Sequence, residues 1–103
     1  MSDLLHQNLN TVHSDKQPKP MTKASAATIA PETFITFVSG TINIATITPP
    51  VTGAHMLVLI FTDASPGDIL TTGNVLVGST LPAQNVPVFL FYDPIQAKYY
   101  VKV

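Results

Sequence analysis

The sequence predicts an all-β fold: a small antiparallel β-sandwich or barrel of about six strands, with an extended N-terminal arm that carries a short helix. Short runs of β-branched and aromatic residues recur along the C-terminal two thirds of the chain, and turns with Pro or Gly separate them. The length of 103 residues permits one domain. Because the strand-type runs begin at residue 33, we divide the chain into an arm, residues 1–32, and a β-domain, residues 33–103.

The predicted arm is rich in polar and small residues, but its first part carries four apolar residues at helical spacing. Residues 3–12 could form a short amphipathic helix with Ser2 as its N-cap. So short a helix is not stable unaided, and the following prolines favour an extended, polyproline-like path. The arm is either a disordered tail or a segment that docks on a partner; the apolar residues favour docking. The expected contacts are Leu4, Leu5, Leu9, Val12, Pro18 and Pro20.

The β-domain begins with two predicted strands. Residues 33–38 form a β-branched and aromatic run, Ser39-Gly40 turns the chain, and residues 41–47 alternate between apolar and polar side chains. We predict that these two strands form a hairpin. Pro49 and Pro50 end the second strand, because neither can donate a backbone hydrogen bond to a neighbour.

The run of residues 56–61, MLVLIF, is continuously apolar, which predicts a central strand buried on both faces. Further strands are predicted at residues 75–77, 88–92 and 98–103. The turn at residues 93–96 joins the last two strands as a hairpin. In the last strand, alternation predicts that Tyr99, Val101 and Val103 face the core and that the other face is wet.

Charge is scarce and unevenly distributed. Only 11% of the residues are charged, and no Asp, Glu, Lys or Arg occurs in residues 33–62 or 69–92. A small sandwich has one interior, yet two predicted strands are apolar on both faces. We expect other copies to cover the second face, so the chain would be a homo-oligomer. The alternative is a monomer with a threonine-clad surface. The expected oligomer interface is Met56, Val58, Ile60, Phe89 and Phe91.

The composition also disfavours other classes of partner. The net charge of −1 gives no electrostatic footprint for nucleic acid. Pro, Gly and polar residues interrupt every apolar stretch before it could span a membrane, and no secretory signal precedes the domain. We expect no nucleic acid, no membrane, and synthesis in the cytoplasm.

No constellation of residues indicates catalysis. Single acidic residues occur in predicted turns, and the chain has no Cys and one Glu. His6 and His13 lie two helical turns apart, too far for one metal ion. The turn acids offer fewer oxygens than Ca²⁺ requires. We expect no enzyme activity, no metal and no cofactor. The acidic residues from Thr33 onward are Asp63, Asp68 and Asp93, and Glu32 immediately precedes Thr33.

Three stretches of the β-domain resemble a known group of proteins. Residues 31–50 (PETFITFVSGTINIATITPP), 70–75 (LTTGNV) and 91–100 (FYDPIQAKYY) look like small virion proteins of tailed double-stranded DNA bacteriophages. These include capsid decoration (cement) proteins and the β-domains of head or tail fibres. The shared features are a strand that ends in Gly-Thr, an ITPP boundary, a TTGN turn and a final hairpin with YDP and KYY.

The resemblance implies a structural virion protein. A decoration protein of this kind is a homotrimeric β-knob on the capsid surface, assembled in the host cytoplasm, whose arm binds the major capsid protein and stabilises the shell. The strand at residues 56–61 would then build the trimer. The alternative is a head or tail fibre or receptor-binding β-module, in which Tyr99 and Tyr100 at the tip would bind a glycan.

Overall fold

A computed structural model describes residues 21–78 and 82–102 of the chain. The expected arm contacts, from Leu4 to Pro20, lie outside the described residues. Within those residues all the regular structure is β-strand, which confirms the all-β prediction. The strands are β1 (Met21–Ala24), β2 (Thr28–Ile29), β3 (Ile35–Ser39), β4 (Thr46–Ile47), β5 (His55–Phe61), β6 (Val75–Val77), β7 (Pro87–Asp93) and β8 (Lys98–Val101).

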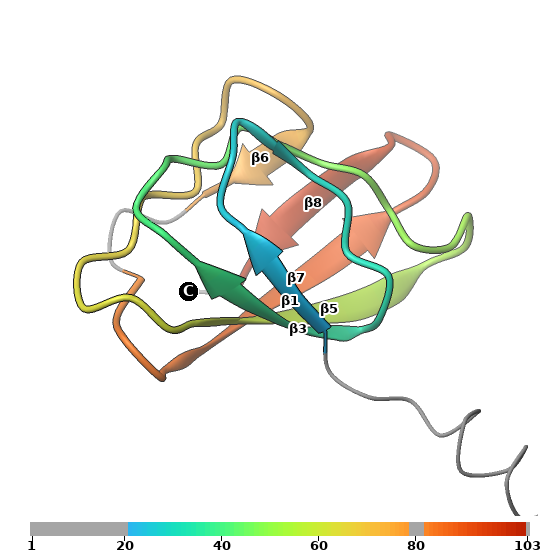
Figure 1. Ribbon diagram of the computed structural model, residues 1–103. Helices are drawn as coiled ribbons and strands as arrows, with labels where there is room; N and C mark the ends of the chain where they lie inside the picture. The colour runs from blue at the N-terminus through green and yellow to red at the C-terminus, as the bar shows by residue number, and fades with distance from the viewer. Residues whose placement is uncertain (1–20, 79–81, 103) are drawn as a thin grey trace, which may run out of the picture.

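Six of these strands form one mixed sheet in the order β1-β3-β5-β7-β8-β6, and β2 and β4 form a small second sheet (Figure 1). Strand β5 has neighbours on both sides, as expected of a central strand. The predicted hairpin of β7 and β8 is confirmed: the two strands are antiparallel, with Tyr92 opposite Tyr99. Tyr99 and Val101 face the core, also as predicted.

The expectation of a purely antiparallel fold is wrong. Only the β5–β7 and β7–β8 pairs are antiparallel, whereas β1–β3, β3–β5, β6–β8 and β2–β4 are parallel. Parallel neighbours need long connections in place of tight turns. The segment of residues 40–54 is such a connection: it joins the parallel strands β3 and β5 and contains only the short strand β4.

The predicted hairpin between residues 33–38 and 41–47 is also wrong. Strand β3 pairs with β1 and β5, and Ile47 of β4 pairs with Ile29 of β2. At Gly40, whose φ is 89°, the chain leaves the sheet. The hydroxyl of Ser25 then accepts a hydrogen bond from the backbone N–H of Ile42 at 2.9 Å, so the segment continues along residues 25–29 and not along β3.

Residues 21–32, which the sequence assigned to the arm, contain two strands in the structure. Strand β1 forms one edge of the large sheet beside β3, and β2 pairs with β4. Pro31 is buried, and Lys23 and Glu32 form an ion pair at 2.9 Å.

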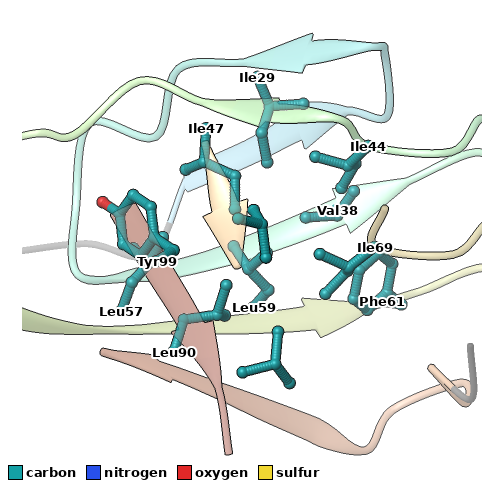
Figure 2. Packing of buried hydrophobic residues seen from close by; sticks show 12 residues of the cluster. Ile29, Val38, Ile44, Ile47, Leu57, Leu59, Phe61, Ile69, Leu90 and Tyr99 are labelled. Atoms are coloured by element: carbon teal, nitrogen blue, oxygen red, sulfur yellow. The ribbon is translucent and has the colours of Figure 1, made fainter. Parts of the chain in front are cut away.

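The core lies between the inner face of the large sheet and the segments that cover it. Figure 2 shows Ile29 and Ile47 of the small sheet on one side of the core and Leu57, Leu59 and Leu90 of the large sheet on the other. The remaining buried hydrophobic residues are Val38, Ile44, Phe61, Ile69, Val75, Tyr99 and Val101.

Hydrogen bonds between the Asn74 side chain in the TTGN turn and the backbone of β4 hold the segments that cover the core together. The Asn74 side chain accepts a hydrogen bond from the Ile47 N–H at 2.8 Å and donates one to the Ile47 carbonyl at 2.6 Å, as a neighbouring strand would. Gly73 lies so close to the Ala45 carbonyl that a Cβ would clash with it. This turn therefore requires Gly followed by Asn.

Candidate functional site

The large sheet has an outer face that the described part of the chain leaves uncovered. Side chains alternate between the two faces of a strand. In β5, Leu57, Leu59 and Phe61 are fully buried. Met56, on the opposite face of the strand, is 45% exposed. Val58 and Ile60 point the same way as Met56 and are half-buried.

The neighbouring strands continue this apolar surface. Met56 lies opposite Phe91 of β7, and Val58 lies opposite Phe89. On the other side of β5, Ile35 of β3 is paired with Val58. Phe91, Phe89 and Ile35 are 47%, 39% and 46% exposed. We call this surface the outer patch and define it as Ile35, Met56, Val58, Ile60, Phe89 and Phe91.

The structure thus brings together all five residues that the sequence predicted as an oligomer interface: they lie on one face of two paired strands. That they contact other copies stays a prediction. Within residues 21–78 and 82–102, β5 is not buried on both faces as predicted, because its outward side chains are exposed or half-buried. A continuous apolar run can mean a strand buried in its own domain or one covered by a partner, and sequence alone does not separate the two.

Sequence analysis missed Ile35 in this patch. The signal was present, since Ile35 and Phe37 alternate with Thr36 and Val38, but either pair could have faced inward. The structure buries Thr36 because its hydroxyl donates to the Thr33 carbonyl at 3.0 Å, which satisfies it inside the core. The more apolar pair therefore faces outward, against the usual preference.

The outer patch contains no charged residue, and charge lies only at its rim. Alternation from Tyr99 and Val101 puts Lys98, Tyr100 and Lys102 on the outer side of the β8 segment. Asp93 of β7 lies opposite Lys98 of β8 in the strand register. The Lys98 ammonium donates a hydrogen bond to the Gly73 carbonyl at 3.2 Å. A partner for this patch must accordingly be apolar at its centre.

A second cluster lies at the start of β5, where His55 contacts three aromatic rings. Its ring stacks on Tyr92 with centroids 5.0 Å apart, and it also contacts Phe34 and Tyr99. Nδ1 lies 2.8 Å from the Gly53 carbonyl oxygen, and Nε2 lies 2.8 Å from the Tyr99 hydroxyl. A carbonyl can only accept, so in neutral His55 the proton is on Nδ1, and the Tyr99 hydroxyl donates to Nε2.

This cluster extends from the core, which contains Tyr99, to the surface, where Phe34 is 48% exposed. The Tyr99 side chain is fully buried, and burial, with the nearby Tyr92, raises the pKa of its hydroxyl well above the ordinary value. The ring faces of Tyr99 are therefore closed to a sugar. Of the two tyrosines in the glycan-binding alternative, Tyr99 is contradicted by its burial, and Tyr100 is half-buried on the outer side.

The acidic turn residues make local hydrogen bonds. Asp63 accepts one from the Ser65 N–H at 3.0 Å, and Asp93 accepts one from the Ile95 N–H at 2.9 Å, both typical of Asx turns. Across residues 21–78 and 82–102, no group of three or more His, Cys, Asp or Glu side chains is placed to hold a metal ion. His6 and His13 lie outside the described residues.

No protein-family model, curated protein or solved structure matches this chain. In the part of the chain that the structure describes, no helix has the length and apolar character needed to cross a membrane. The outer patch is the feature of these residues that most needs a functional explanation.

Proposed function

We propose that this chain is a structural protein of a virus particle: a capsid decoration (cement) protein that binds the head of a tailed bacteriophage as a homo-oligomer. The outer patch carries the proposal. Monomeric soluble proteins rarely leave a contiguous apolar surface of more than a few hundred Å² in water, and larger ones usually mark interfaces.

Two further features support this function. The stretches ITPP, TTGN and YDP-KYY resemble small virion proteins, and the turn that TTGN forms holds the cover of the core in place. The apolar residues Leu4, Leu5, Leu9 and Val12 precede β1, the edge strand of the large sheet. In the proposed function these residues, with Pro18 and Pro20, bind the major capsid protein at the surface of the virion.

The test is binding to heads assembled from the major capsid protein of the phage to which this proposal assigns the chain. The full chain and a chain that starts at residue 21 are each mixed with these heads and sedimented. We expect the full chain to pellet with the heads and the shortened chain to stay in the supernatant, because only the first carries the apolar quartet. The cut is made at residue 21, since β1 begins there.

A matched control separates the arm's apolar contacts from its mere presence. In a full-length variant with Leu4, Leu5 and Leu9 each changed to Ser, the chain length and charge are unchanged, and we expect binding to be lost. Heads that bind the shortened chain as strongly as the full one would contradict the role of the arm. Failure of every form to bind would contradict the decoration function.

A further inference from the structure

We propose that the outer patch binds the outer patch of a second copy of this chain, face to face, about a two-fold axis that runs between β5 and β7. This inference rests on the homo-oligomeric assembly proposed above, and it specifies the contacts and the symmetry of that assembly.

The size of the patch fits such a partner. A Phe side chain presents about 200 Å² when fully exposed, so the six partly exposed side chains together present on the order of 500 Å². With the surrounding side chains of β8 and β3, the surface approaches the ~800 Å² per partner of a standard stable interface. Two copies of one sheet can therefore bury enough area against each other.

The patch consists of two rows that a two-fold rotation exchanges. Phe89 and Phe91 form an aromatic row along β7, beside an aliphatic row of Met56, Val58 and Ile60 along β5. Rotation by 180° about an axis between the two strands lays the aromatic row of one copy over the aliphatic row of the other. Two such sheets pack about 10 Å apart, as in a β-sandwich.

The chemistry of the patch favours an identical partner over a charged one. The patch has no charged side chain with which to recognise an acidic or basic surface, and the whole chain has a net charge of only −1, so two copies repel each other little. The rim residues Asp93, Lys98 and Lys102 carry both signs.

The number of patches determines the symmetry. An interface that uses the same patch on both copies closes as a two-fold dimer, whereas a three-fold ring needs two different patches that fit each other. Among the described residues the patch centred on β5 and β7 is the largest run of paired exposed apolar side chains in the sheet. Of the other strongly exposed apolar side chains, Ile42, Val51 and Ile95 are on loops and turns, and Leu76 and Val77 are on β6, which β8 separates from β7. The resulting dimer differs from the trimer that the resemblance to decoration proteins implies.

The first experiment measures mass in solution. Light scattering after size exclusion, with the chain near 100 µM, should give twice the 11.0 kDa of one chain. In the variant Phe89→Lys the two new charges would lie within the interface, and we expect a monomer. The matched control Ile42→Lys adds the same charge at a site 57% exposed in the loop before β4 and should remain a dimer. Circular dichroism checks that each variant is folded.

The second experiment does not depend on a disruptive variant. Because the chain has no cysteine, Phe89→Cys gives a single reactive site. A bismaleimide about as long as the ~10 Å separation of packed sheets should cross-link it to a covalent dimer. Ile42→Cys, on the covering side of the core, should not be cross-linked.

A monomeric or trimeric mass for the unmodified chain would overturn the proposal, as would a dimer that tolerates Phe89→Lys or equal cross-linking at both cysteines. The chain that starts at residue 21 should still dimerise; loss of its dimer would identify the N-terminal residues as the occupant of the patch. A dimer that does not bind capsids would support this interface and contradict the decoration function. A monomer that binds capsids would support the decoration function and contradict this interface.

Discussion

At the scale of single residues, the half-buried His55 and the buried Tyr99 link the start of β5 to the start of β8. The Tyr99 hydroxyl ends in the core and has one described partner, His55 Nε2 at 2.8 Å. That bond satisfies a polar group that would otherwise be buried without a partner, which costs more than an ordinary hydrogen bond contributes. Tyrosine is tolerated in this core because histidine is within reach.

This pair makes stability depend on alkaline pH. The raised pKa of Tyr99 means that the folded chain keeps a proton that the unfolded chain releases above its ordinary pKa of about 10. The ionisation of Tyr99 should therefore leave the free energy of unfolding unchanged below about pH 10 and should lower it as the pH rises further. Urea unfolding between pH 8 and 11 measures this fall.

In Tyr99→Phe the contribution of this residue to the alkaline fall should disappear, while stability at pH 8 drops by about 1 kcal/mol through the lost hydrogen bond. Tyr100→Phe, on the outer side of the same strand, is the matched control and should keep the fall seen in the unmodified chain. An equally steep fall in Tyr99→Phe would contradict the assignment to Tyr99.

At the scale of strands, β5 supplies both the core and the outer patch. Leu59 is fully buried, whereas Met56 on the opposite face is 45% exposed. We expect Leu59→Ala to lower the free energy of unfolding by about 2–5 kcal/mol at every protein concentration, because it leaves a cavity in the core.

Met56→Ala should behave differently, since its main effect is on association. Binding between copies stabilises the folded state only when the concentration exceeds the dissociation constant. The unfolding temperature of Met56→Ala should therefore be lower than that of the unmodified chain at 100 µM, and the difference should shrink on dilution to 1 µM. A lowering of the unfolding temperature by Met56→Ala that does not depend on concentration would mean that this side chain stabilises only its own domain.

Sequence patterns predicted the strands better than their partners. The runs at residues 75–77, 88–92 and 98–103 correspond to β6, β7 and β8, because β-branched and aromatic residues with flanking turns report local conformation directly. The parallel pairs were missed, since a parallel neighbour is chosen by contacts between distant segments. Ser25 is an example: it directs Ile42 away from β3, and no pattern near residue 42 indicates this.

The candidate site was predictable in part for the same reason. Alternation along residues 56–61 and 88–92 put Met56, Val58, Ile60, Phe89 and Phe91 into one set, and their pairing in the structure brings that set onto one surface. Alternation does not reveal which set faces the core. In β3 the inward set contains Thr36, so composition would have favoured the wrong face.

At the scale of the whole molecule, the described residues contain a complete core that runs from Ile29 to Val101. A chain that starts at residue 21 should consequently unfold cooperatively and within about 1 kcal/mol of the full chain. A chain that starts at residue 31 lacks β1 and β2 and should be strongly destabilised, because Ile29 leaves the core. Thermal unfolding of the two forms checks this, and equal stability of both would contradict the place of β2 in the core.

The position of β8 in the sheet has a consequence for how the chain folds during synthesis. Strand β8 is made after β6 and β7 but lies between them, and its Tyr99 and Val101 side chains are buried in the core. On the ribosome, β6 has no neighbour in the large sheet until residues 98–101 have left the exit tunnel. The apolar faces of β5 and β7 are meanwhile open on both sides, and such unpaired strands are prone to aggregate. We therefore expect a nascent chain of this protein to be most prone to aggregation before its last strand, β8, is in place.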